Sequence, residues 1–227
     1  MEQKLSLIQL EDISFGYPNC GLVLSNLSLN VSKGDRIALL GGNGVGKTTL
    51  FHIILGLIRP FTGSIKLFGR ECLKETDFRE PRKKIGLLFQ DPDDQLFSPS
   101  VIEDVSFGPL NLGMSRKEAI RVSRQCLERL GIAHLEKRVP YELSGGEKKL
   151  VALAAVMAMK PRILLLDEPM AGLEMKAVER FFSAIQDEDI DAFIIITHLP
   201  NLIKHMVNRT LVMENGGLKP KPLGFSS

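Results

Sequence analysis

The chain has 227 residues, of which 44% are hydrophobic and 25% are charged, and its formal net charge is +2. A chain of this length can bury one sizeable hydrophobic core. Because its charge is nearly balanced, there is no electrostatic case for binding nucleic acid or an anionic membrane surface, and we expect no nucleic-acid partner.

Targeting signals and cysteine usage both indicate an intracellular setting. Met1–Leu10 is charged and lacks a signal-peptide core, and no apolar run approaches the roughly 18–20 residues that span a bilayer. We therefore expect the protein to stay in the cytoplasm. Cys20, Cys72 and Cys126 are scattered, with no C-x-x-C pair. This usage suits a reducing compartment and argues against a thiolate metal site.

A glycine-rich loop follows a short apolar run. Arg36–Leu40 is typical of a buried parallel strand, and Gly41–Thr48 (GGNGVGKT) fits the phosphate-loop pattern G-x-x-x-x-G-K-[ST]. The glycines permit positive φ, so backbone N–H groups can converge on an anion at the N-terminus of the next helix. The spacing of the apolar residues that follow predicts a core face for this helix, made of Leu50, Ile53, Ile54, Leu57 and Ile58.

This loop predicts a nucleotide site. Lys47 would reach the β- and γ-phosphates, and the Thr48 hydroxyl would ligate Mg²⁺. The alternative is a chance glycine turn, which the strand–loop–helix context disfavours. The candidate nucleotide-binding residues of the loop are Gly41, Asn43, Gly44, Val45, Gly46, Lys47, Thr48 and Thr49.

The middle of the chain carries a polar segment and then a distinctive helix start. The apolar run Ile85–Phe89 ends at Gln90, which opens the segment QDPDDQLF. By itself this segment is a polar, proline-containing loop that leads into a helix.

Further on, Ser144 and Glu147 of the sequence LSGGE form a capping box at the start of a helix that is apolar all round. A capped helix N-terminus with two glycines is also an anion site, so the two interpretations are compatible.

Two later strands end in polar side chains. ILLLDEP predicts a buried parallel strand that ends at Asp167 and Glu168, and ligands sit at the carboxyl ends of such strands. Asp167 would hold Mg²⁺ through water, and Glu168 would polarise the water that attacks the γ-phosphate. An exposed acidic turn before a proline is the alternative. Phe193–Thr197 predicts another strand, which His198 follows.

These motifs, in this order, resemble those of the ATP-binding-cassette (ABC) ATPases. The resemblance rests on the phosphate loop, LSGGE and ILLLDEP, and it covers nearly the whole chain. It implies an α/β fold: a P-loop NTPase core with a mixed sheet, N-terminal antiparallel strands and a helical subdomain. We expect the core at residues 1–90 and 144–227, and the helical subdomain at residues 91–143.

The resemblance also implies the role of each candidate residue. Glu168 would be the general base, His198 would contact the γ-phosphate, and Gln90 would sense Mg²⁺ and the attacking water. Tyr17 would stack on adenine, although a core or edge-strand tyrosine is the alternative. The Mg²⁺ ligands would be Thr48, Gln90 and Asp167. The γ-phosphate of an ATP held by the opposite subunit would be bound by Ser144, Gly145 and Gly146.

The runs Gln90–Phe97 and Glu103–Gly113 look like those of energy-coupling-factor transporter ATPases, especially the cobalt or nickel kind. We therefore expect an ATP-hydrolysing importer subunit on the cytoplasmic face of the membrane. Its partners would be a second copy, or a second ATPase, and integral membrane subunits. The cargo would be cobalt, nickel or a vitamin such as biotin. The alternatives are a soluble ABC ATPase and a regulatory subunit with little turnover.

Four positions depart from the family pattern. Leu150 stands where the signature helix usually has an arginine, and Glu174 replaces the usual aspartate of the D-loop, residues Ala171–Glu174. Leu199 replaces the acidic residue that often follows the histidine at position 198 in the family, and Asn208 replaces a common aspartate. These departures leave the rate of hydrolysis and the tightness of a dimer open.

Overall fold

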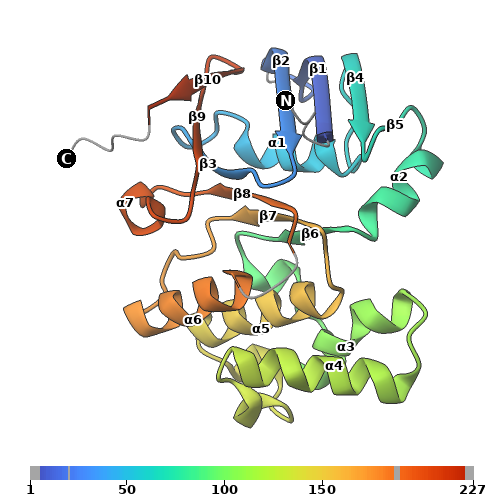
Figure 1. The fold of residues 1–227 in the computed structure, drawn as a ribbon, viewed down its shortest axis with the longest axis vertical. Helices are drawn as coiled ribbons and strands as arrows, with labels where there is room; N and C mark the ends of the chain where they lie inside the picture. The colour runs from blue at the N-terminus through green and yellow to red at the C-terminus, as the bar shows by residue number, and fades with distance from the viewer. Residues whose placement is uncertain (1–5, 20, 187–189, 223–227) are drawn as a thin grey trace. The chain divides into compact units, whose positions relative to one another are not determined.

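The computed structural model describes residues 6–19, 21–186 and 190–222 (Figure 1). The chain divides into two compact units, Met1–Ile85 with Asp191–Ser227, and Gly86–Ile190. Both contain helices and strands, so the predicted α/β class is confirmed. The predicted division into a core and a helical subdomain at residues 91–143 stays a prediction.

The first sheet of the first unit is antiparallel throughout. Its strands are ordered β2-β1-β4-β5, and neighbouring strands pair in opposite directions. This confirms the antiparallel N-terminal strands expected from the sequence. The strands are β1 (Ser6–Gly16), β2 (Leu22–Ser32), β4 (Thr62–Leu67) and β5 (Arg70–Glu71).

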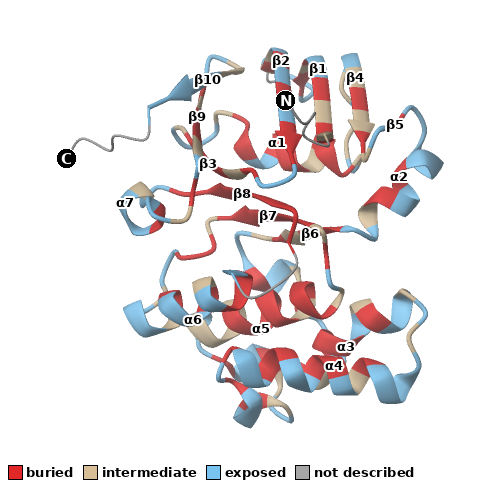
Figure 2. Ribbon diagram, in the orientation of Figure 1, coloured by how far each residue is buried: buried red, intermediate tan, exposed pale blue. Residues whose placement is uncertain are grey.

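A second, mixed set of strands in this unit carries the phosphate loop. The predicted strand Arg36–Leu40 is confirmed as β3, and it runs parallel to both β8 (Ala192–Ile196) and β9 (Arg209–Glu214). The short β10 (Gly217–Lys221) pairs antiparallel with β9. Figure 2 shows β3 and β8 as mostly buried, which explains why their sequences are continuous apolar runs rather than alternating ones.

The helix after the phosphate loop is shorter than the sequence predicts. α1 (Lys47–Ile54) buries Leu50, Ile53 and Ile54 as expected. The predicted core face does not extend to Leu57, which is 53% exposed, or to Ile58, which is only half-buried. The helix stops because Gly56 has φ +63°, and no Cβ would fit there, since it would lie 2.6 Å from the Phe78 ring.

Arg82 of α2 (Glu75–Arg82) completes this helix end. Its side chain donates hydrogen bonds to the carbonyl oxygens of Leu55 and Gly56. These carbonyls lie at the C-terminus of α1, where a cation is favourable. The remaining helix of the first unit is the short α7 (Pro200–Ile203).

Asn208, one of the four departures, has a structural explanation. Its side-chain oxygen accepts a hydrogen bond from the backbone N–H of Arg36, and its amide nitrogen donates to the carbonyl of Gly34. The amide thus serves one donor and one acceptor where β3 begins. An aspartate could serve only the donor when ionised.

The second unit is built around the helix that LSGGE opens. This helix is α5 (Gly145–Ala158), and its residues from Leu150 to Leu153 are buried. Leu150, which stands where the family usually has an arginine, is only 4% exposed and belongs to the core. The other elements are β6 (Ile85–Leu88), where the unit begins, the 3₁₀ turns Pro92–Asp94, Ala133–Leu135 and Pro140–Glu142, α3 (Val101–Asn111), α4 (Arg116–Arg129), β7 (Ile163–Asp167) and α6 (Met175–Gln186).

None of the helices in the described part of the chain is long and apolar enough to cross a bilayer. Cys72 and Cys126 are buried thiols, whereas Cys20 lies outside the described residues.

Candidate functional site

The phosphate loop has the backbone that the glycine pattern predicts. It leaves the end of β3 at Gly41 and enters α1 through Gly46, which is the N-cap residue with φ +106°. Gly41 and Gly44 also have positive φ, at +147° and +73°. These conformations are the ones that favour glycine. Such conformations allow successive peptide N–H groups to point toward an anion at the start of α1.

Close packing adds a second reason for glycine at two positions. A Cβ on Gly46 would lie 2.8 Å from the Val23 side chain and 2.9 Å from that of Leu24. A Cβ on Gly41 would lie 2.7 Å from the carbonyl oxygen of Met213. The loop therefore packs tightly against β2 and β9 of its own unit at Gly46 and Gly41.

Lys47 places its charge on this loop. The side chain is only 8% exposed, and its ammonium donates hydrogen bonds to the carbonyl oxygens of Gly41 (2.9 Å) and Gly42 (2.7 Å). A partly desolvated cation at a helix N-terminus is strongly attractive to a polyphosphate. Thr48 and Thr49 follow it in the first turn of α1.

The structure links Tyr17 to the phosphate-loop helix. Its hydroxyl lies 3.2 Å from the hydroxyl oxygen of Thr49, within hydrogen-bond distance. Phe15 packs edge-on against Tyr17, with ring centroids 4.9 Å apart, and stacks on Phe61 at 5.7 Å. The Tyr17 ring stays half exposed at 42%. A rigid, partly exposed aromatic ring beside the phosphate loop can stack on a base.

Phe15 and Phe61 are not predicted from the sequence as residues of this site. Phe15 could have been found, because it stands two residues before Tyr17 at the end of β1, and residues two apart in extended chain share a face. Phe61 could not, because its contact with Phe15 depends on the pairing of β1 with β4, which brings Ser14 opposite Thr62.

His198 lies at the same edge of the sheet as the phosphate loop. β3 and β8 are parallel, and Leu39 is opposite Ile196, so both strands end at this edge. Thr197 is buried, and its hydroxyl accepts a hydrogen bond from the N–H of Leu199. This turn leaves the His198 side chain exposed. The first unit therefore brings together Tyr17, residues 41–49 and His198.

In the second unit, Gln90 begins a loop that is anchored to α5. Gln90 itself is exposed. Gln95 donates to the carbonyl oxygen of Ala152 at 2.9 Å, and Asp93 forms an ion pair with Lys148 at 2.6 Å. The loop is thus held by two side chains to the helix that LSGGE opens.

The LSGGE helix start has the predicted capping box. The Ser144 hydroxyl accepts from the N–H of Glu147 at 3.3 Å, and the Glu147 carboxylate accepts from the Ser144 N–H at 2.9 Å. Hydrogen bonds from the Ser144 hydroxyl and N–H lower the pKa of Glu147. Ser144 and Gly145 are exposed, and a Cβ on Gly145 would meet nothing within 4 Å. This helix N-terminus is open to an anion from outside the chain.

The strand predicted from ILLLDEP is confirmed as β7, which ends at Asp167. Asp167 is buried, with 3% of its surface exposed. Glu168 comes next with φ +45°, in the left-handed region that non-glycine residues rarely adopt. Its carbonyl oxygen accepts a hydrogen bond from Lys149 of α5. Lys149 is not predicted from the sequence, because nothing in the local pattern indicates that this lysine reaches a turn beyond β7.

The predicted metal ligands have suitable chemistry. Thr48, Gln90 and Asp167 offer a hydroxyl, an amide oxygen and a carboxylate, the hard oxygen donors that Mg²⁺ prefers. Among residues 6–19, 21–186 and 190–222, no group of three or more His, Cys, Asp or Glu side chains could hold a metal ion. The predicted set contains one carboxylate, so phosphate oxygens would have to complete it.

Comparison with known proteins gives consistent matches along the chain. A family model described as ABC transporter matches residues 24–171. A Brucella suis biovar 1 protein whose name places it among ABC transporter ATP-binding proteins is 51% identical over 88% of this chain and 83% of its own length. The energy-coupling factor transporter ATP-binding protein EcfA of Methanothermobacter thermautotrophicus is 39% identical over 93% of this chain and 69% of its own.

Solved structures agree with these matches. cbiO1 from Clostridium perfringens, described as part of the ABC transporter complex cbiONQ, is 34% identical with a TM-score of 0.82, over 96% of this chain and 88% of that one. The ATP-binding cassette MJ0796, solved as a dimer in a post-hydrolysis state with ADP and Pi, has a TM-score of 0.86 at 25% identity, over 96% of this chain and all of that one.

Proposed function

Because the chain belongs to the ABC transporter family, as an ATPase whose hydrolysis is coupled to transport, we propose that it powers an energy-coupling-factor importer from the cytoplasmic face of the cell membrane. This proposal rests on the similarity of the chain, along nearly its whole length, to EcfA proteins and to cbiO1. The runs Gln90–Phe97 and Glu103–Gly113 support the same subfamily.

ATP binding falls to the first unit in this proposal. The loop N–H groups and Lys47 hold the β- and γ-phosphates, and Tyr17 stacks on adenine. The buried position of Lys47 and the contact of Tyr17 with Thr49 support these roles. His198 contacts the γ-phosphate from the end of β8.

Hydrolysis requires an activated water. Glu168 is the proposed general base, which takes the proton of the water as it attacks the γ-phosphorus, while the bond from this phosphorus to the β,γ-bridging oxygen breaks and ADP leaves. Gln90 helps to orient that water. Thr48, Gln90 and Asp167 would hold Mg²⁺, which when bound neutralises charge on the β- and γ-phosphate oxygens.

A second copy of the chain completes the site in this proposal. Ser144, Gly145 and Gly146 would bind the γ-phosphate of an ATP held by the opposite subunit. Their exposed, capped helix N-terminus supports this role. A homodimer is the simplest arrangement, and a heterodimer with another ATPase is the alternative.

The proposed cargo is a transition metal ion, cobalt or nickel, with biotin as the second candidate. The cargo would pass through membrane subunits and would not contact this chain.

The test is uptake into proteoliposomes that contain this chain and the membrane proteins it co-purifies with. We expect ATP-dependent uptake of cobalt or nickel. Uptake of biotin alone would replace the metal, and purification without any membrane protein would favour a soluble ABC ATPase.

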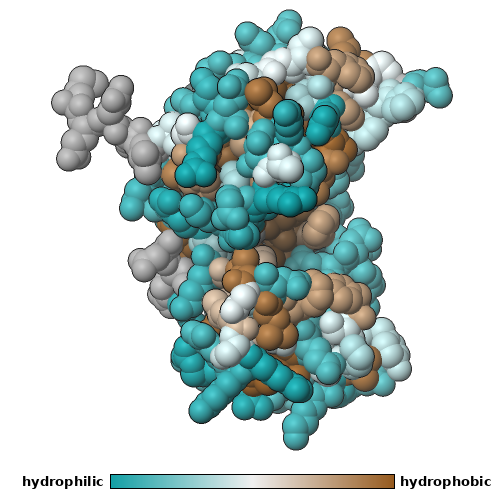
Figure 3. All heavy atoms as spheres, turned by 90° about the vertical axis from the view of Figure 1, so that its right-hand side faces the viewer, coloured by the Kyte–Doolittle hydropathy of each residue, from teal (hydrophilic) through white to brown (hydrophobic). Residues whose placement is uncertain are grey.

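An exposed apolar patch on α3 and the loop before it is the proposed docking site for a membrane subunit. Phe97 is 68% exposed and Phe107 47%, and their rings pack edge-to-face at 5.0 Å. Figure 3 shows hydrophobic side chains reaching the surface among hydrophilic ones on the face it presents. The loop backbone is fixed, because the buried carboxylate of Asp104 accepts from the N–H groups of Phe97 and Ser98. A fixed apolar patch of this kind can accept a partner helix.

We predict that a photo-cross-linker at Phe97 captures an integral membrane subunit in the assembled complex. A cross-linker at Leu73, whose side chain is about as exposed, is the control and should capture none. Mass spectrometry of the cross-linked band identifies the partner. Equal capture from both positions, or no capture from Phe97, would contradict this docking site.

A further inference from the structure

We propose that Lys149 is a positioning residue for hydrolysis, which holds the turn after β7 so that the Glu168 carboxylate faces the attacking water. This inference rests on the proposed role of Glu168 as the general base. Lys149, Glu168 and the turn all belong to the second unit.

Two hydrogen bonds tie Lys149 to both ends of the turn. Its ammonium donates to the carbonyl oxygen of Glu168 at 3.2 Å and to that of Ala171 at 2.5 Å. The N–H of Ala171 also donates to the carbonyl of Glu168, at 3.3 Å. One cation therefore joins the first and last peptide groups of a four-residue turn.

The turn needs such a support because Glu168 is held in an unfavourable backbone conformation. Its φ of +45° lies in the left-handed region, which a non-glycine residue keeps only where its surroundings fix it. The same peptide orientation sends the Glu168 carbonyl toward α5. If Lys149 is removed, the turn keeps the Ala171–Glu168 hydrogen bond but loses the two bonds to the ammonium, and we expect the carboxylate to be held less firmly in its productive position.

The helix presents Lys149 in a fixed direction. Leu150 and Val151, the next two residues of α5, are buried, so the helix cannot rotate about its axis. Burial lowers the pKa of Lys149, while the charges of Glu168 and Asp91 oppose this shift. Asp91 follows Gln90 directly, so the same ammonium lies near the start of the loop that carries this glutamine. Lys149 thus stands among three proposed functional segments: the LSGGE helix, the Gln90 loop and the Glu168 turn.

The decisive variant is Lys149→Met, which keeps the length of the side chain and removes its charge and donors. We expect kcat for ATP hydrolysis to fall about 10- to 100-fold, as for other supports of a reacting group. KM for ATP should stay within about twofold, because the phosphate-holding residues are untouched. Lys149→Gln, which retains an N–H donor, should turn over faster than Lys149→Met.

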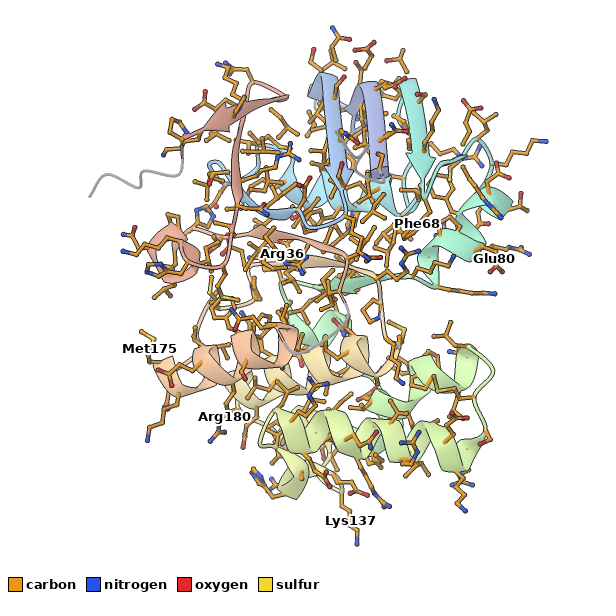
Figure 4. The ribbon with its side chains drawn as sticks, in the orientation of Figure 1. Arg36, Phe68, Glu80, Lys137, Met175 and Arg180 are labelled. Carbon is orange, nitrogen blue, oxygen red and sulfur yellow. The ribbon has the colours of Figure 1, made fainter. Side chains whose placement is uncertain are left out.

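Lys137→Met is the matched control, because it removes the same chemical group from an exposed side chain of the same unit that points away from the ribbon (Figure 4). It should leave kcat and KM unchanged. Thermal unfolding of each variant shows whether it is folded, and if Lys149→Met is not, the comparison of Lys149→Gln with the wild type decides.

A double-mutant cycle separates positioning from a general structural role. In a Glu168→Gln background the base is absent, so adding Lys149→Met should reduce the residual turnover by less than about twofold. A further loss as large as in the wild type would overturn the inference, and so would an unchanged kcat for Lys149→Met. If Glu168→Gln alone keeps full turnover, the assignment of the base fails instead, which is a different outcome.

Discussion

Replacing Lys47 with alanine is expected to abolish tight ATP binding. The ammonium is the one side-chain cation that the described phosphate loop, residues 41–48, contains. It is fixed over the loop by two carbonyl oxygens. Hydrogen bonds from a desolvated cation to phosphate are among the strongest in proteins. Their loss from a buried site costs about 3–5 kcal/mol, or a factor of about 10²–10³ or more in Kd.

Isothermal calorimetry with ATP measures this change. Lys219→Ala is the control, because Lys219 is an exposed side chain of the same unit, and its ion pair with Glu214 contributes little to stability. It should bind ATP as the wild type does. If Lys47→Ala is folded and its affinity for ATP is unchanged, the phosphate loop does not hold the nucleotide as proposed.

The parts of the site that the sequence predicts best are set by local chemistry. The positive φ of Gly41 and Gly46 follows from residue type, and the capping box of Ser144 and Glu147 follows from a spacing of three residues. The buried strands β3 and β7 follow from short apolar runs. In each case the cause lies within a few residues of its effect.

The parts that the sequence does not predict depend on residues far apart in the chain. Phe78 packs so closely on Gly56, at the end of α1, that no Cβ fits there, and the apolar spacing that continues to Ile58 gives no sign of this contact. Lys149 reaches the Glu168 turn only because α5 and β7 pack within one unit. A helical pattern shows which face is buried, but it does not show which turn a lysine on the other face will touch.

Replacing Glu168 with glutamine is expected to trap an ATP-bound dimer. Glutamine keeps the shape of the side chain but cannot take a proton from water. ATP would therefore remain between the phosphate loop of one subunit and the Ser144 helix of the other. The γ-phosphate is the bridge in this arrangement, so its release after hydrolysis separates the subunits and converts chemistry into motion. Light scattering with saturating ATP should give a mass about twice that of the wild-type monomer.

Adding Ser144→Arg tests which surface forms that bridge. The exposed helix start has no room for a large side chain once a partner's phosphate is bound, so the double variant should return to a monomer. The monomer should still bind ATP, because residues 41–49 are intact, and calorimetry checks this.

A Glu168→Gln protein that stays monomeric with saturating ATP would argue against a homodimer. It would favour a heterodimer with a second ATPase, in which Glu174, exposed just before α6, marks one side of an asymmetric interface. Mixing the chain with its partner ATPase should then restore the trapped dimer, since the partner would supply the helix N-terminus that binds the γ-phosphate held by this chain.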